Sequence, residues 1–138
     1  MRTLHFGMRV ADIDRSLAFY TAVGYEVVGR VPETPLGELT MLKLPNDEFV
    51  TIELVHDGTQ GDGNVGTALS HFVIQVESLD ATIAELSARG IEADVPASPD
   101  GSADLRTTSI VDPDGNRVEL VQWPAGHADG MSAADWAD

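Results

Sequence analysis

The chain has 138 residues, of which 43% are hydrophobic, enough to bury the core of one compact domain or of two small fused modules. It carries 23 acidic and 8 basic residues and a formal charge of −15, which disfavours nucleic acid and anionic membranes as partners. Cysteine is absent and no apolar run approaches the roughly 20 residues of a membrane span, so we expect a soluble cytoplasmic protein.

The first part of the chain, residues 1–55, predicts a β-α-β-β-β module. Its expected elements are one strand, one helix and three strands, over residues 4–10, 13–23, 25–31, 39–44 and 49–55. Asp12 is placed to cap the helix and Gly24 to end it. Residues 56–69 are rich in Gly and Asp and lack apolar periodicity, so we interpret them as a linker.

Residues 70–122 repeat this plan. The expected elements are again one strand, one helix and three strands, over residues 70–76, 79–89, 91–95, 105–111 and 117–122. Ser78 is placed to cap the helix and Gly90 to end it. The tail, residues 123–138, matches nothing in the first module; Ser132 can cap a short helical turn there, and the tail either covers a groove or frays. The pattern predicts an α+β fold of two paired β-α-β-β-β modules within one compact domain.

The two modules align at a constant offset of 66 residues, which places His5 on His71 and Glu53 on Glu119. A repeat that keeps its apolar pattern indicates a shared fold. A repeat that also keeps a histidine and a glutamate indicates a shared site. We therefore interpret His5, Glu53, His71 and Glu119 as one constellation, against the alternative that these residues are inherited without binding an ion.

Two imidazoles and two carboxylates suit one borderline divalent ion, with nickel, cobalt or zinc first and iron or manganese next. With water in the remaining positions, such an ion can hold two neighbouring oxygens of a small substrate and stabilise a developing enolate. Arg9 shares a strand face with His5, and Arg117 shares one with Glu119. Each arginine is a candidate to anchor an anionic substrate, or is simply solvated.

Two runs carry a resemblance to a known family: residues 4–20, with Leu4-His5-Phe6-Gly7-Met8-Arg9-Val10-Ala11-Asp12 followed by Ser16-Leu17-Ala18-Phe19-Tyr20, and residues 112–120, Asp112-Pro113-Asp114-Gly115-Asn116-Arg117-Val118-Glu119-Leu120. They resemble the vicinal oxygen chelate superfamily, and most closely the short bacterial glyoxalase I enzymes, or lactoylglutathione lyases. The resemblance covers Met1 to about Gln122. It implies curved mixed sheets around one metal, with His5, Glu53, His71 and Glu119 as ligands.

The resemblance also implies a reaction. A hemithioacetal of methylglyoxal and a thiol would become a thioester through an enediolate. Glu119 is our choice for the catalytic base, with Glu53 assisting or acting on the opposite face. Short members of the family commonly form homodimers, in which His5 and Glu53 of one chain would meet His71 and Glu119 of the other.

Relatives with other functions differ at these positions. Glutamate at position 53 favours the glyoxalase-like branch over the ring-cleaving dioxygenases and the methylmalonyl-CoA epimerases. Antibiotic-binding members, similar to bleomycin resistance proteins, generally lack the ligands, and a non-catalytic binding protein is the alternative function. In the glyoxalase I enzymes that the chain resembles, an asparagine and a lysine usually contact glutathione. Both are missing here, from residues 54–57 and 100–104. We therefore expect the protein to bind glutathione weakly. Its substrate would then contain a different thiol or be unrelated to the hemithioacetals.

Overall fold

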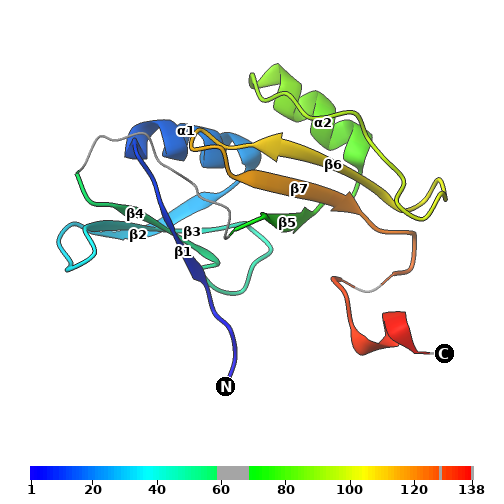
Figure 1. Cartoon of the computed structure of the whole chain (residues 1–138), viewed down its shortest axis with the longest axis horizontal. Helices are drawn as coiled ribbons and strands as arrows, with labels where there is room; N and C mark the ends of the chain where they lie inside the picture. Colours follow the sequence, from blue (N-terminus) through cyan, green and yellow to red (C-terminus); the bar gives the residue numbers. More distant parts are fainter. Residues whose placement is uncertain (59–68, 128, 138) are drawn as a thin grey trace. The chain divides into compact units, whose positions relative to one another are not determined.

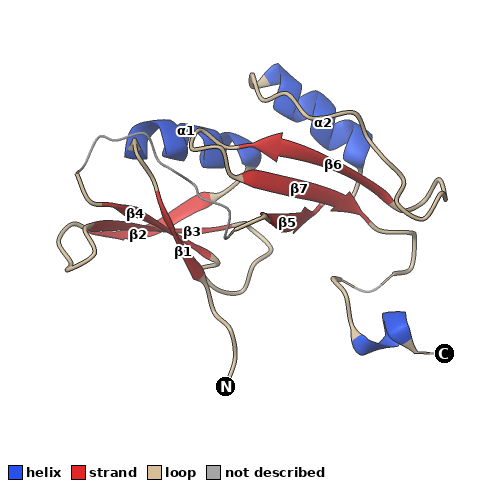
Figure 2. Cartoon of the chain, viewed as in Figure 1, coloured by secondary structure: helices blue, strands red, loops and turns tan. Residues whose placement is uncertain are grey.

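The protein is described from a computed structural model, which covers residues 1–58, 69–127 and 129–137, so most of the predicted linker lies outside the described residues. Two compact units make up the chain: residues 1–69 with the turn 112–116, and residues 70–111 with 117–138. Figures 1 and 2 show that strands dominate both units. Among the described residues, the first unit has the α-helix α1 (Ile13–Val23) and the second has the α-helix α2 (Leu79–Ala88). The predicted α+β class is confirmed.

The first unit holds a mixed four-stranded sheet in the order β1-β4-β3-β2. Its elements are β1 (Phe6–Arg9), α1 (Ile13–Val23), β2 (Glu26–Val31), β3 (Glu38–Lys43) and β4 (Ile52–His56). β1 runs parallel to β4, and the other neighbours are antiparallel. Both predicted ends of α1 are confirmed: the Asp12 side chain accepts a hydrogen bond from the Arg15 N–H at 3.0 Å, and Gly24 ends the helix at φ 128°.

The second unit holds a three-stranded sheet in the order β5-β7-β6. Its elements are β5 (His71–Gln75), α2 (Leu79–Ala88), β6 (Arg106–Val111), β7 (Arg117–Gln122) and the short 3-10 helix η1 (Ala133–Trp136). β5 is parallel to β7 and β6 is antiparallel to it, so these three strands repeat the arrangement of β1, β4 and β3. Ser78 caps α2 as predicted, through a 3.3 Å hydrogen bond from the Ala81 N–H.

The predicted strand over 91–95 is wrong, because this segment forms no regular ladder. It still lies beside β6, since Asp94 N donates to Ser109 O at 2.9 Å and Ala97 forms an isolated bridge with Thr107. Two residues lie between Asp94 and Ala97, while one lies between their partners Ser109 and Thr107, so one residue has no counterpart on β6. Pro96 occupies this stretch and has no N–H to donate, which explains why a second repeating bond does not form.

β4 is one of the two inner strands of the first sheet and β7 is the middle strand of the second, and apolar side chains of both strands are buried in the cores. Leu54 in β4 is 0% exposed, and Leu120, at the same place in the repeat, is 1% exposed. Burial of a leucine side chain contributes about 2 kcal/mol. The alternate residues of these strands, Glu53 and Glu119, therefore sit on rigid supports.

The tail is attached to the second unit by specific contacts. Gln75 at the end of β5 donates from Nε2 to Asp129 Oδ1 at 2.8 Å and accepts from the Gly130 N–H at 3.1 Å. The predicted cap at Ser132 is confirmed, and η1 follows it. No helix in the described part of the chain is long and apolar enough to cross a membrane.

Candidate metal centre

The parallel register of β1 and β4 brings His5 and Glu53 together. Glu53 lies in the middle of β4, opposite Gly7 on one side and Met41 on the other. His5 precedes β1, where the Phe6 N–H donates to Thr51 O at 3.3 Å and continues the ladder by one step. His5 Nε2 is 3.3 Å from Glu53 Oε2, and the carboxylate side chain is only 15% exposed.

β5 and β7 produce the corresponding pair in the second unit. His71 begins β5 opposite Arg117, and Glu119 lies two residues farther along β7. His71 Nε2 is 3.9 Å from Glu119 Oε2, and Glu119 is 33% exposed. Ser70 Oγ lies 2.9 Å from His71 Nδ1, so the hydroxyl orients the imidazole and leaves Nε2 facing the carboxylate.

The spacing within each pair can be compared with that of two ligands on one metal ion. Two N or O donors at about 2.1 Å from an ion, at an angle between 90° and tetrahedral, are about 3.0–3.4 Å apart. The 3.3 Å of the first pair lies in this range, and the 3.9 Å of the second requires a shift of about half an ångström. The donor chemistry of both pairs fits a borderline divalent ion.

Within residues 1–58, 69–127 and 129–137, no three His, Asp or Glu side chains are grouped closely enough to hold a metal. Each pair supplies two donors, whereas catalytic sites use three or more protein ligands. The described residues thus contain two such His–Glu pairs, one in each unit, which we call the first and the second half-site. Whether all four ligands meet at one ion remains a prediction from the sequence.

Both candidate substrate anchors are engaged in ion pairs with aspartates. Arg9 Nη1 lies 2.7 Å from Asp57 Oδ2, with the two side chains 64% and 31% exposed. Arg117 Nη1 lies 3.2 Å from Asp94 Oδ2, and both side chains are more than half exposed. The sequence indicated the two arginines but neither partner, because each aspartate lies more than 20 positions away along the chain and no local pattern connects it with its arginine.

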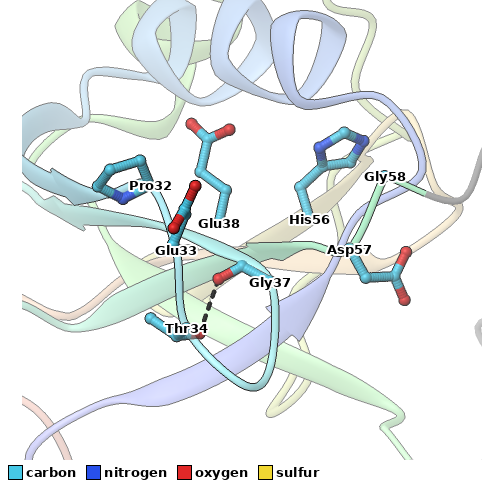
Figure 3. A pocket seen from close by; sticks show the side chains of 8 residues that line it. All are labelled: Pro32, Glu33, Thr34, Gly37, Glu38, His56, Asp57 and Gly58. Carbon is cyan, nitrogen blue, oxygen red and sulfur yellow. Dashed lines mark hydrogen bonds between the residues drawn. The ribbon is translucent and has the colours of Figure 1, made fainter.

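A surface hollow of about 340 Å³ lies at the end of β4 (Figure 3). It is lined by Pro32, Glu33, Thr34, Gly37, Glu38, His56, Asp57 and Gly58. A Cβ on Gly37 would approach His56 O to 2.5 Å, so only glycine lets the β2–β3 loop lie this close to the strand end. His56 was predicted to lie in the linker, but it is the last residue of β4, and Figure 3 shows its ring on the same side as Glu38.

A buried polar network in the first unit was also missed from the sequence. Tyr20 is fully buried and donates to Asp112 Oδ2 at 2.6 Å, and Asn116 Nδ2 donates to the same oxygen at 2.9 Å. Burial, followed by the hydrogen bond to Asp112, raises the pKa of Tyr20 far above its usual 10.0. The phenol therefore stays protonated and holds the turn at 112–116.

Residues 2–120 of the chain match the Glyoxalase/Bleomycin resistance protein/Dioxygenase superfamily. The chain is 31% identical over 124 residues to a probable lactoylglutathione lyase of Vibrio parahaemolyticus, covering 88% of this chain and 90% of that protein. It is 30% identical over 130 residues to a probable lactoylglutathione lyase of Vibrio cholerae, covering 92% and 94%. A solved glyoxalase I mutant from Zea mays superposes with a TM-score of 0.77 at 25% identity, covering 89% of this chain and 45% of that one.

Proposed function

Because the chain belongs to the Glyoxalase/Bleomycin resistance protein/Dioxygenase superfamily, we propose that it is a glyoxalase I-like, metal-dependent lyase. Its reaction converts the hemithioacetal of methylglyoxal and a thiol into a thioester. The observation that carries the proposal is the repeated His–Glu pair, in which the donor atoms of each pair face one another across a parallel strand pair. The shared strand register explains the matching placement, and the presence of both a histidine and a glutamate at these places in each unit supports a common role.

His5, Glu53, His71 and Glu119 would together hold one nickel, cobalt or zinc ion, with iron or manganese as alternatives. When bound, the ion supplies positive charge that polarises the substrate oxygens and stabilises the enediolate. We also propose that the protein forms a homodimer, in which the His5–Glu53 pair of one chain meets the His71–Glu119 pair of the other. Two pairs then give the four protein ligands that neither pair has alone.

Glu119 is the residue that we propose to move the proton. Its carboxylate is more exposed than that of Glu53 and lies 3.9 Å from its histidine, so it is the less tightly held of the two. It would take the proton from the carbon that bears sulfur and return it to the neighbouring carbonyl carbon. The hydroxyl proton of the first carbon would pass to the oxygen of the second, so the hemithioacetal becomes a 2-hydroxy thioester without loss or gain of atoms. Glu53, held closer to His5, assists from the other unit.

Metal analysis and turnover of matched variants test the proposal. We expect one ion per four-ligand site in the wild type, and at least about a tenfold loss of metal affinity in His5→Ala and in His71→Ala. His56→Ala is the control, since it removes a strand histidine that belongs to neither pair. Glu119→Gln should lose turnover by at least about a hundredfold.

Mixing two inactive variants tests the shared site. If each site is completed by two chains, a heterodimer of His5→Ala and His71→Ala chains contains one site with all four ligands, and activity returns on mixing. A protein that purifies with stoichiometric metal but isomerises no hemithioacetal would overturn the reaction. A metal-free protein that tolerates all four substitutions would instead support the alternative of a non-catalytic binding protein.

A further inference from the structure

The arginine beside the first half-site, Arg9, already forms an ion pair with an aspartate of the same chain. Arg9 lies on the same face of β1 as Gly7, which is opposite Glu53 in the register. Asp57 follows β4 and pairs with Arg9 at 2.7 Å. A substrate carboxylate that approached Arg9 would have to displace Asp57 or share the guanidinium with it. Arg9 therefore offers an anion much less attraction than an unpaired arginine does.

The second half-site shows the same arrangement. Arg117 is directly opposite His71 in the register of β5 and β7, and it pairs with Asp94 at 3.2 Å. The two units reach this arrangement independently, because Asp57 and Asp94 do not correspond at the 66-residue offset. Both arginines that are candidates to anchor the substrate thus form an ion pair with an aspartate.

The surroundings of Arg9 add further negative charge. The hollow at the end of β4 is lined by Glu33 and Glu38 as well as Asp57 (Figure 3). Other basic side chains are similarly engaged: Arg106 pairs with Asp80 at 2.9 Å, and Lys43 donates to a backbone carbonyl at 3.1 Å. With a net charge of −15 over the chain, an anion meets repulsion on approach and finds little compensating attraction at the site.

From these ion pairs we infer that the thiol whose hemithioacetal this protein isomerises carries no net negative charge, and that Asp57 is a specificity-determining residue. This inference rests on the proposed function and narrows its substrate class. A neutral or cationic thiol avoids the competition with Asp57 and Asp94. A thiol with free carboxylates, such as glutathione, encounters it at both arginines.

The first experiment compares two thiols that share one skeleton and differ in charge. Methylglyoxal hemithioacetals of glutathione and of its dimethyl ester are supplied to the metal-loaded wild-type protein. We expect kcat/KM for the ester adduct to be at least about tenfold higher at low salt, and the ratio to shrink at high salt. A glutathione adduct that reacts as fast as the ester adduct, or faster, would overturn the inference while leaving the proposed function intact.

The second experiment removes one aspartate at a time. Asp57→Asn should lower KM for the glutathione adduct about two- to fivefold, leave kcat unchanged, and leave the ester adduct unaffected. Asp104→Asn is the control, because it removes the same charge from an exposed loop outside both half-sites. Equal effects of the two substitutions would show that total charge, and not Asp57, sets the preference, and would overturn its role.

A binding measurement separates the two possible failures. Calorimetric titration with S-methylglutathione and with its dimethyl ester reports the charge preference without turnover. Tighter binding of the ester is expected, and tighter binding of S-methylglutathione with its two free carboxylates contradicts the inference. Absence of turnover with both adducts in a metal-loaded protein would instead refute the proposed function, and the inference with it.

Discussion

The two units place the same pair of side chains on the same kind of support, yet the pairs differ. In the first unit, His5 and Glu53 are 3.3 Å apart and the carboxylate is largely enclosed. In the second unit, His71 and Glu119 are 3.9 Å apart and the carboxylate is twice as exposed. The first sheet also has a fourth strand, β2, where the second has the irregular segment 91–97. The repeat thus keeps a histidine and a glutamate in both units, while the glutamate is more enclosed and closer to its histidine in the first unit than in the second.

The largest effects are expected where the two units are most alike, at the middle of their cores. Leu54→Ala and Leu120→Ala each remove a fully buried side chain from a central strand, and each should lower the free energy of unfolding by about 2–5 kcal/mol. Urea denaturation followed by circular dichroism measures both losses. Val28→Ala, at an exposed position of β2, is the control and should change stability by less than about 0.5 kcal/mol. A Leu120→Ala substitution that hardly changes the free energy of unfolding would show that β4 and β7 do not contribute equally to stability.

Tyr20 and Leu86 occupy the same position in the repeat, both buried, but only Tyr20 carries a polar group. Tyr20→Phe removes the hydrogen bond to the Asp112 carboxylate and should cost about 1–3 kcal/mol at neutral pH. Because Leu86 has no hydroxyl to lose, the second unit should show no counterpart of this effect.

The raised pKa of Tyr20 also predicts a pH dependence. The folded protein holds the phenolic proton more tightly than the unfolded chain, so this contribution to stability is fully present below pH 10.0 and is lost as the pH rises toward the folded-state pKa. Unfolding free energies measured from pH 8 to about 11 should fall for the wild type and fall less steeply for Tyr20→Phe. Equal slopes in the two proteins would show that Tyr20 does not cause the loss of stability at high pH. Burial also raises the pKa of Tyr25, which contributes equally to the slopes of the wild type and of Tyr20→Phe.

Gly7 and Val73 are a second pair of repeat positions that differ, each beside its glutamate on the strand face. Gly7 has no positive φ, and a Cβ there would lie 3.6 Å from Val55 Cγ2 and 3.8 Å from Glu53 Oε1, which are ordinary contacts. Gly7→Ala should therefore leave stability unchanged or raise it by up to about 1 kcal/mol. Val73→Gly should lower it by about 1 kcal/mol. Thermal unfolding measures both, and a clear loss in Gly7→Ala would mean that β1 requires glycine.

The smallest effect concerns the surface pair of Arg106 and Asp80, since Thr40 replaces the arginine in the first unit. The hydrogen bond and charge of Arg106 lower the pKa of Asp80 below 3.8, so its contribution to stability is present above that pH and is lost on acidification. Carboxyl titration by NMR should show a midpoint below 3.8 that returns to the usual value in Arg106→Gln. An unchanged midpoint would indicate that the pair does not persist in solution.

Local signals were sufficient to predict most elements of both units. α1 has the predicted bounds because Asp12 and Gly24 act through bonds to neighbours within one helical turn. β7 likewise has its predicted bounds after a turn rich in Pro and Gly. The expected strand at 91–95 failed because a strand needs a partner in register, and the irregular pairing with β6 is not encoded in the alternation of residues 91–95 themselves.

The sequence by itself determined the two modules, their 66-residue register and the equivalence of His5 with His71 and of Glu53 with Glu119, because alternation and caps act between neighbours. Only the tertiary structure decided which residues meet across the chain. Arg9 finds Asp57 at 48 positions away, and Tyr20 finds Asp112 at 92 positions away. Such contacts depend on how strands align and how turns dock, and no local pattern specifies that alignment. The ion pairs beside the two His–Glu pairs, Arg9 with Asp57 and Arg117 with Asp94, arise at this level.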